Sequence, residues 1–387
     1  MTYLRSHPHI TATKDWALSE EVLFMLGQCE AIIKAISEFP LTPEHRQRLL
    51  TLSLRKEARA TTAIEGNTLT EEEIARIDEG ESLPPSKEHL EREVKNIFEA
   101  LNKIKVNVIL EDKAAIITPA VIKSFHYDVG KNLEDHFKAT PGRFQEKNQA
   151  GGSDGASESR DFPTLIQTFC DWMNETFGSG KDKQTFADQV IHAIVFHVYL
   201  VWVHPFGDGN GRTARLIESY LLLRAEVPDI ASHILSSYYH DTSEEYFRQL
   251  DIVGKKRNLS DFIRYAVLGF RDGLDEILTI NQRTIRDIVW EHFIFEVLDS
   301  NKATGKTKAI VRRRRTVALH FPTDKFYKVD ELIENNPFLM KEYVKISSTT
   351  RKRDFQELEK LDLIVKKGSK YIGNVEILKG PMSLKNE

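Results

Sequence analysis

The sequence predicts a mainly α-helical protein whose C-terminal part carries a small β-hairpin. Apolar residues recur at helical spacing through most of residues 17–297, and the clearest extended runs lie within residues 363–378. Hydrophobic residues make up 41% and charged residues 29% of the chain, which are ordinary values for a folded globular protein. A length of 387 residues exceeds what one hydrophobic core usually holds, so we expect two or three domains.

We expect the first domain, residues 1–110, to consist of helices. Apolar periodicity and helix-stop residues predict helices over residues 17–39, 42–64, 71–77 and 88–104. Thr70 and Glu73 form a capping box at the start of the third of these helices.

The second expected domain, residues 111–283, is also helical. Its helical patterns cover residues 121–129, 164–177, 183–203, 212–224, 244–250 and 260–280. The segment VFHVYLVWV could form a strand, but the surrounding 21 residues lack turn residues and favour a buried helix. Residues 141–161 hold several glycines among polar residues, which predicts a loop or a weak hairpin. Loops of this length in a compact domain usually serve a function.

The third expected domain, residues 284–387, is basic and ends in the hairpin. Helical patterns and then extended runs are predicted at residues 284–297, 329–334, 347–361, 363–366 and 371–378. Helix, helix and hairpin in this order are typical of a winged helix. Residues 301–387 contain 20 Lys and Arg against 11 Asp and Glu, a net charge of +9, whereas the preceding 300 residues carry −13.

The basic clusters at residues 312–315 and 351–353 are candidate DNA contacts, the second at the start of the expected recognition helix. The same residues could instead solvate a helix face, or the domain could bind another protein. The net charge of the whole chain, −4, indicates no particular partner.

Composition also excludes several classes of protein. Two cysteines, Cys29 and Cys170, cannot build a disulfide framework or a thiolate metal site, so we expect a reduced, cytoplasmic location. The N-terminal residues lack the apolar stretch of a signal peptide. The longest apolar run, residues 193–203, is interrupted by His197 and is too short to span a bilayer, so we expect no membrane contact.

The segment HPFGDGNGRTAR, residues 204–215, has the features of a phosphate site. Its glycines allow successive backbone N–H groups to converge, and the helix that follows adds its free N–H groups and the positive end of its dipole. Arg212 and Arg215 lie on one side of that helix and can reach the same polyphosphate. Asp208 suits a Mg²⁺ ion between the protein and phosphate oxygens. His204 could accept a proton near neutral pH.

Other motifs do not fit these residues. A Walker loop needs Lys and then Ser or Thr after its last glycine, where this chain has Arg212, and the spacing G-x-G-x-G differs from the dinucleotide fingerprint. A calcium loop starting at Asp208 would need Glu where Ser219 stands. The spacing of His192, His197 and His204 is not that of a zinc motif.

The segment resembles the Fic family, whose signature is HPFx(D/E)GNGRxxR. Every fixed position is matched, by His204, Pro205, Phe206, Asp208, Gly209, Asn210, Gly211, Arg212 and Arg215. The resemblance covers about residues 57–274. It implies a Fic-type helical bundle core and an enzyme that transfers AMP from ATP to a Ser, Thr or Tyr hydroxyl of a protein target, including itself. Fic proteins often dimerise.

The resemblance also implies a role for each residue of the signature. His204 would be the general base, and Asp208 would hold Mg²⁺ against the phosphates. The backbone of Gly209, Asn210 and Gly211, with the Asn210 side chain, would bind the phosphate oxygens. Arg212 and Arg215 would bind the leaving pyrophosphate. These roles agree with the chemistry, because charge that builds on phosphate oxygens is stabilised by fixed donors and a metal.

A second motif, residues 61–67, resembles the inhibitory helix [S/T]xxxE[G/N] of Fic proteins. Thr61 and Glu65 lie one helical turn apart and on one face. The resemblance implies that Glu65 pairs with Arg215 and blocks the productive γ-phosphate position. The hairpin flap of the family is expected within residues 142–162. Two alternatives stay open, namely removal of AMP by water that Glu65 positions, and a DNA-binding winged-helix regulator whose Fic core senses nucleotide.

Overall fold

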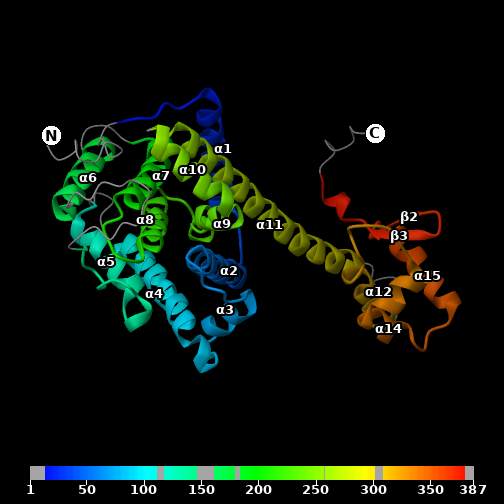
Figure 1. Ribbon diagram of the computed structural model, residues 1–387. Coiled ribbons are helices and arrows are strands. Elements are labelled where there is room, and N and C mark those ends of the chain that lie inside the picture. The colour runs from blue at the N-terminus through cyan, green and yellow to red at the C-terminus, as the bar shows by residue number, and fades with distance from the viewer. Residues whose placement is uncertain are drawn as a thin grey trace. The chain divides into compact units, whose positions relative to one another are not determined.

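The computed structural model describes residues 14–110, 117–145, 161–178, 184–256, 258–300 and 308–379. The chain forms two compact units, Met1–Leu278 and Thr279–Glu387. The predicted hairpin flap falls mostly on residues 146–160, which lie outside the described residues. The mainly α-helical class that the sequence predicts is confirmed, because most described residues are helical and the strands are short (Figure 1).

The first unit is built from helices. Their bounds are α1 Glu20–Glu38, α2 Pro43–Ala63, α3 Glu71–Asp78, α4 Glu88–Leu110, α5 Pro119–Gly130, α6 Phe162–Phe177, α7 Phe186–Val203, α8 Asn210–Arg224, α9 Ile234–Asp241 and α10 Ser243–Lys256. The predicted capping box at Thr70 and Glu73 is present at the start of α3. Helix α9 was not predicted, because its eight residues give too short a pattern to recognise.

Helices α7 and α8 form the centre of this unit and lie side by side (Figure 1). Helix α2 packs against α9, α4 and α8, and α5 packs against α4 and α8. By length and composition alone α7 could cross a membrane. Its apolar residues are instead buried among the neighbouring helices, which is the usual setting of a core helix. The prediction of a buried helix, and not a strand, for this segment is therefore confirmed.

Helix α11, Ser260–Ser300, is one continuous helix in which the sequence predicted two. The prediction of a break at residues 281–283 is wrong, because Asn281, Gln282 and Arg283 include no glycine or proline to interrupt a helix. The predicted domain boundary at residues 283 and 284 lies inside this helix, as does the division between the two compact units.

The second unit contains the C-terminal part of α11 and a small sheet. Its other elements are α12 Lys308–Leu319, β1 Tyr327–Lys328, α13 Val329–Asn335, α14 Pro337–Tyr343, α15 Ser348–Lys360, β2 Ile364–Lys367 and β3 Lys370–Gly373. The three strands are antiparallel in the order β1-β3-β2, so the predicted hairpin gains a third strand. Tyr327 pairs with Tyr371, and Val365 pairs with Ile372. The predicted helices at residues 329–334 and 347–361 correspond to α13 and α15, but α12, α14 and β1 were not predicted. The predicted extended run 371–378 is wrong beyond Gly373, because Val375–Leu378 form a 3-10 helix. The winged-helix assignment stays a prediction.

Candidate functional site

Residues 204–209, here called the motif loop, turn the chain sharply between α7 and α8. His204 ends α7 with φ 49° and Gly209 precedes α8 with φ 72°, so both adopt the left-handed conformation. Only glycine adopts that conformation without steric strain, which explains Gly209. Among the described residues no side chain caps the N-terminus of α8. Its first N–H groups are therefore suited to an anion.

The side chain of Asn210 holds the motif loop in shape. Its Nδ2 donates to the carbonyl oxygen of Phe206 over 2.7 Å, and its Oδ1 accepts from the Phe206 N–H over 3.0 Å. Both Asn210 and Phe206 are buried. In this structure the Asn210 side chain is therefore committed to the loop, and the N–H groups of Asn210 and Gly211, at the start of α8, are the donors near the expected phosphates.

The carboxylate of Asp208 is oriented by three donors. Its Oδ1 accepts from the Gly209 N–H (2.6 Å) and from Arg212 Nη2 (3.0 Å), and its Oδ2 accepts from the Lys138 N–H (3.1 Å). Across the described part of the chain, no three His, Cys, Asp or Glu side chains cluster closely enough to hold a metal alone. A single carboxylate nevertheless suits Mg²⁺, which commonly takes waters and phosphate oxygens as its other ligands.

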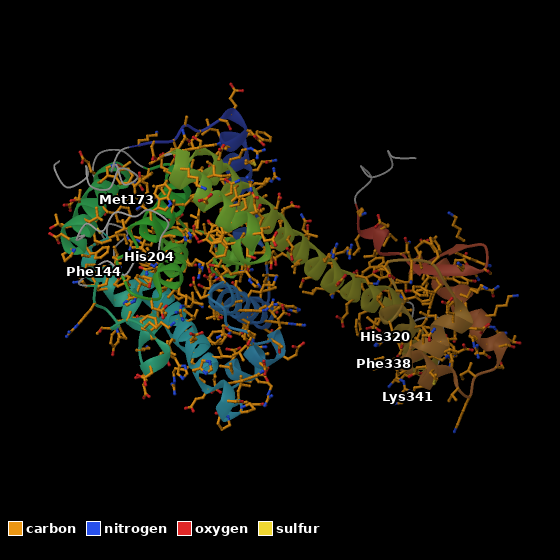
Figure 2. All side chains as sticks on the ribbon, in the orientation of Figure 1. Phe144, Met173, His204, His320, Phe338 and Lys341 are labelled. Atoms are coloured by element: carbon orange, nitrogen blue, oxygen red, sulfur yellow. The ribbon has the colours of Figure 1, made fainter. Side chains whose placement is uncertain are left out.

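His204 lies at the exposed end of α7 (Figure 2), where a protein hydroxyl could approach it. Its Nδ1 lies 3.4 Å from the carbonyl oxygen of Val201. Because a carbonyl oxygen can only accept a hydrogen bond, the neutral tautomer compatible with this contact carries its proton on Nδ1. Nε2 is then the nitrogen that can accept a proton.

Arg215 is almost fully buried and is held by the last turns of α2. Its Nε donates to Thr61 Oγ1 and its Nη2 to the carbonyl oxygen of Thr61, each over 2.9 Å. Nη2 also forms an ion pair with Glu65 Oε1 at 2.7 Å. The structure therefore brings together Thr61, Glu65 and Arg215, which are about 150 residues apart in sequence.

The carboxylate of Glu65 also lies against the first turn of α8. The space in which a Cβ atom on Gly211 would stand is taken by Glu65 Oε1 and by Nη1 of Arg215. Any larger residue at position 211 would therefore displace the carboxylate. Glu65 thus places a negative charge at the helix N-terminus that the sequence assigns to phosphate. Its side chain remains 31% exposed, so it is not sealed in place.

Arg212 is buried and is held by two carboxylates. Its Nη1 contacts Glu93 Oε1 and its Nη2 contacts Asp208 Oδ1, both at 3.0 Å. Oε2 of Glu93 accepts from Asn67 Nδ2 over 2.9 Å. The segment that supplies Glu65 to Arg215 therefore also contacts, through Asn67, the carboxylate that holds Arg212.

A buried polar network that the sequence analysis missed lies beneath Arg215. Glu57 Oε1 accepts from Ser219 (2.7 Å) and from Ser236 (2.9 Å), and burial raises the pKa of this carboxyl to about 7. Burial also raises the pKa of the neighbouring carboxyl of Glu218, next to Ser219 in α8, well above its ordinary value. Glu57 could have been found from the sequence, because it precedes Thr61 by four residues, as Thr61 precedes Glu65.

The basic clusters of the C-terminal unit are largely paired within that unit. Arg313 and Arg314 are buried, and their Nε atoms bind the two oxygens of Asp354 at 2.7 and 2.8 Å. Arg351 pairs with Asp330 at 2.9 Å. The expectation of an exposed cationic cluster at residues 312–315 is therefore wrong for its two central arginines, because they face the core beside α15. DNA contact by this unit stays a prediction.

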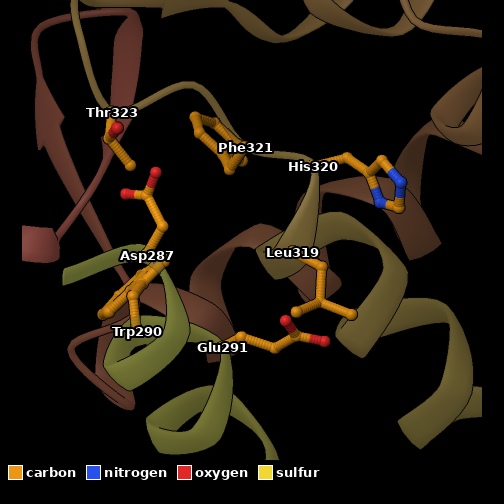
Figure 3. Close-up of a pocket in the computed structure, with 7 residues that line it drawn as sticks. All are labelled: Asp287, Trp290, Glu291, Leu319, His320, Phe321 and Thr323. Atoms are coloured by element: carbon orange, nitrogen blue, oxygen red, sulfur yellow. The ribbon is translucent and has the colours of Figure 1, made fainter. Parts of the chain in front are cut away.

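The C-terminal unit also has a surface hollow of about 460 Å³ (Figure 3). Its lining residues are Asp287, Trp290, Glu291, Leu319, His320, Phe321 and Thr323. Figure 3 shows Asp287 extending toward Thr323 and Glu291 lying beneath Leu319. None of the residues that the sequence singled out for chemistry lines this hollow.

Comparison with known proteins gives a family match that includes the motif loop. Residues 116–222 match the Fic/DOC family. The chain is 33% identical over 175 residues to the protein adenylyltransferase Fic of Nematostella vectensis, which is 44% of this chain and 38% of that protein. It is 28% identical over 208 residues to the protein adenylyltransferase fic-1 of Caenorhabditis elegans, which is 53% of this chain and 37% of that protein. The chain thus spans less than half the length of these curated relatives.

Two solved structures have the same fold. A Fic family protein from Desulfovibrio desulfuricans G20 aligns with a TM-score of 0.56 at 17% identity, over 95% of this chain and 99% of that one. A fragment of Fic-1 from C. elegans aligns with a TM-score of 0.55 at 22% identity, over 68% of this chain and 73% of that one. At these identities the likeness supports the fold alone, and it confirms the predicted helical architecture.

Proposed function

We propose that this chain, which carries a Fic domain over residues 116–222, is an autoinhibited protein adenylyltransferase that transfers AMP from ATP to a hydroxyl side chain of a protein. The observation that carries the proposal is the placement of Glu65 against Gly211 and Arg215, at the end of a helix suited to phosphate. A carboxylate in this place keeps Arg215 in position and at the same time prevents a phosphate from binding there. The names of the curated relatives support the same activity.

In the proposed reaction, His204 Nε2 accepts the proton of the target hydroxyl while the hydroxyl oxygen bonds to the α-phosphorus of ATP. The bond from that phosphorus to the bridging oxygen breaks, and pyrophosphate leaves with the electron pair. The N–H groups at the start of α8 bind the phosphate oxygens, and Arg212 and Arg215 bind the pyrophosphate. Mg²⁺ bound at Asp208 would supply charge neutralisation on the phosphates.

The proposed inhibition follows from competition for Arg215. Glu65 bonds the Nη2 atom that a phosphate oxygen would otherwise bind, and it repels the negative triphosphate at short range. Activation then requires Glu65 to leave, so that the phosphate takes over its hydrogen bond to the arginine. Because α2 is held at Glu57 by Ser219 and Ser236, the smallest such movement is confined to the end of α2 after Thr61.

The proposal includes ATP and a protein target as partners, with self-modification as the simplest readout, and a cytoplasmic location. The free, buried Cys29 and Cys170 agree with a reducing compartment. A homodimer stays a prediction.

The activity is tested with ATP that carries its label on the α-phosphate, in the presence of Mg²⁺ and the full chain. We expect label on the Glu65→Gly variant and none when His204→Ala is added to it. ATP labelled on the γ-phosphate should leave the protein unlabelled, because pyrophosphate departs. Transfer that persists at full rate without His204 would show that the base is assigned wrongly.

The same material distinguishes the alternative of AMP removal. Labelled Glu65→Gly protein is freed of ATP and then mixed with unlabelled wild-type chain. Loss of the label that depends on Glu65 in the added chain would favour removal of AMP over transfer. We expect the label to remain, because Glu65 is hydrogen-bonded to Arg215.

A further inference from the structure

The segment formed by residues 138–145, here called the strap, runs beside the motif loop. The Lys138 N–H donates to Asp208 Oδ2 over 3.1 Å at one end. At the other end the Gln145 N–H donates to the carbonyl oxygen of Pro205 (3.0 Å), and Gln145 Nε2 donates to that of His204 (2.9 Å). The strap therefore contacts both ends of the motif loop, the end with the proposed base and the end that leads to the phosphate donors.

His126 of α5 joins the strap to the motif loop. Its Nδ1 accepts from the Gly142 N–H of the strap, and its Nε2 contacts the carbonyl oxygen of Asp208, each over 2.9 Å. The ring is fully buried and stacks on Phe206, with ring centres 3.6 Å apart and planes within 3°.

These two contacts define one form of the His126 ring. An N–H group can donate only to a nitrogen without a proton, so Nδ1 is bare. A carbonyl oxygen can only accept, so Nε2 carries the proton. The ring is therefore neutral, with an acceptor toward the strap and a donor toward the motif loop. Neither bond survives if the tautomer is reversed.

Each bond controls a different end of the motif loop. The carbonyl of Asp208 belongs to the same peptide unit as the Gly209 N–H, which donates to Asp208 Oδ1. Holding that carbonyl therefore orients the Asp208 carboxylate and the residue that begins α8. The bond to Gly142, whose φ is +76°, holds the strap three residues before Gln145, which binds the His204 carbonyl.

We propose that His126 is a positioning residue that sets the spacing between the proton-accepting end of the motif loop, at His204, and its phosphate-binding end, at Asp208 and Gly209. The two ends must be in register because His204 accepts the proton of a hydroxyl that attacks the phosphate held at the other end, and small misplacements cost rate. This inference rests on the proposed transfer of AMP, in which both ends act at once.

The chemistry of His126 allows its two bonds to be removed separately. The terminal amide of His126→Gln can place an N–H donor near the position of Nε2, so it keeps the bond to Asp208 and loses the one to Gly142. The shorter amide of His126→Asn can place an oxygen near the position of Nδ1, so it keeps the bond to Gly142 and loses the one to Asp208. Both variants are made in the Glu65→Gly chain, in which transfer is expected to be measurable.

The two variants should affect different kinetic constants. For His126→Gln we expect kcat to fall about tenfold while affinity for α,β-methylene-ATP with Mg²⁺, measured by calorimetry, stays within about twofold. For His126→Asn we expect that affinity to fall about tenfold. Equal losses of both quantities in both variants, together with a lowered Tm, would mean that His126 only supports the fold and would overturn the inference.

A spectroscopic measurement tests the tautomer independently of activity. In full-length protein labelled with ¹⁵N-histidine, the His126 ring, identified by its loss in His126→Gln, should show a protonated Nε2 and a bare Nδ1 at pH 7. A proton on Nδ1 would overturn the inference. If Glu65→Gly transfers no AMP, the proposed function fails, while the nucleotide affinities and the tautomer still decide the role of His126.

Discussion

Two pairs of arginines, one in each compact unit, have opposite settings. Arg212 and Arg215 of α8 are held by carboxylates whose side chains are 15% to 31% exposed, on Glu93, Asp208 and Glu65. Arg313 and Arg314 of α12 share Asp354, whose side chain is only 2% exposed. All four arginines are buried, so burial alone does not separate the two pairs.

The difference lies in whether the partner can be exchanged. A phosphate can replace a partly exposed carboxylate, because the leaving carboxylate returns to water and the arginine keeps an anionic partner. If Asp354 left, Arg313 would lose its buried anion and Arg314 would keep only its contact with Glu357 at 3.5 Å, so the ion pairs of Asp354 are structural. The comparison therefore supports the proposed ligand-binding role of the pair on α8 and indicates that the pair on α12 stabilises the fold.

The largest expected effect is on the structural pair. Asp354→Ala leaves Arg313 and Arg314 without their shared anion, so we expect the C-terminal unit to lose about 3–5 kcal/mol of unfolding free energy. Urea denaturation of the full chain, followed through Trp290 by comparison with a Trp290→Phe control, measures the loss. A loss below about 1 kcal/mol would remove the contrast between the two pairs.

The next largest effect on the unfolding free energy is expected at Glu57, which holds α2 in place and with it Glu65, the partner of Arg215. Its folded pKa, about 7, lies above the ordinary value of 4.5, so the folded state binds a proton that the unfolded state has lost between these pH values. The stability that Glu57 contributes is therefore present below pH 4.5 and is lost as the pH rises through 7. Glu57→Gln imitates the protonated form and should gain on the wild type by up to about 3 kcal/mol between pH 5 and 8.

Thermal and urea unfolding of the two chains at each pH measure that gain. Taking the difference between the chains cancels the titration of other groups. A constant difference from pH 5 to 8 would show that Glu57 is ionised in the folded state.

The proposed role of Arg212 and Arg215 in binding phosphate is tested through the rate of AMP transfer. In the Glu65→Gly chain, Arg215→Lys should lower AMP transfer about 100-fold, or about 2.7 kcal/mol, because lysine lacks the planar fork that binds two oxygens. Initial rates with labelled ATP measure this. An unchanged rate would mean that Arg215 only supports the fold. Arg224→Lys, at the far end of α8, serves as the matched control.

The smallest effect is expected for an exposed pair. Arg351 binds Asp330, whose side chain is 80% exposed, so Asp330→Ala should change the unfolding free energy by less than about 0.5 kcal/mol. Urea denaturation of Asp330→Ala and Asp354→Ala under the same conditions measures the two losses of unfolding free energy. A loss as large as that of Asp354→Ala would show that exposure of the partner does not decide the strength of these pairs.

Local patterns predicted the parts of the site that are local in sequence. The glycines before α8 and the helix that follows were visible in residues 204–215, and the contact of Glu65 with Arg215 was expected from the resemblance. Glu93 and His126 were missed because each is one of several polar residues in its helix, and its partners come from other elements. No local sequence pattern predicts contacts between residues of different elements.

The four arginines at residues 312–315 show how a cluster can mislead. From the sequence alone they are candidate DNA contacts, which requires them to be exposed. The helical spacing instead indicates that Arg314 faces the core, because it lies three residues after Val311 and four before Ala318, which are both buried. The anion that balances Arg313 and Arg314 lies 40 residues further along, and only packing reveals it.

The central claim is that Glu65 closes a competent site, and the most direct test is the rate of AMP transfer with and without its side chain. Initial rates are measured for the wild type, for Glu65→Gly and for Glu71→Gln, which alters an exposed carboxylate of the neighbouring helix. We predict at least a tenfold increase for Glu65→Gly and the wild-type rate for Glu71→Gln. Equal rates for the wild type and Glu65→Gly would contradict the account.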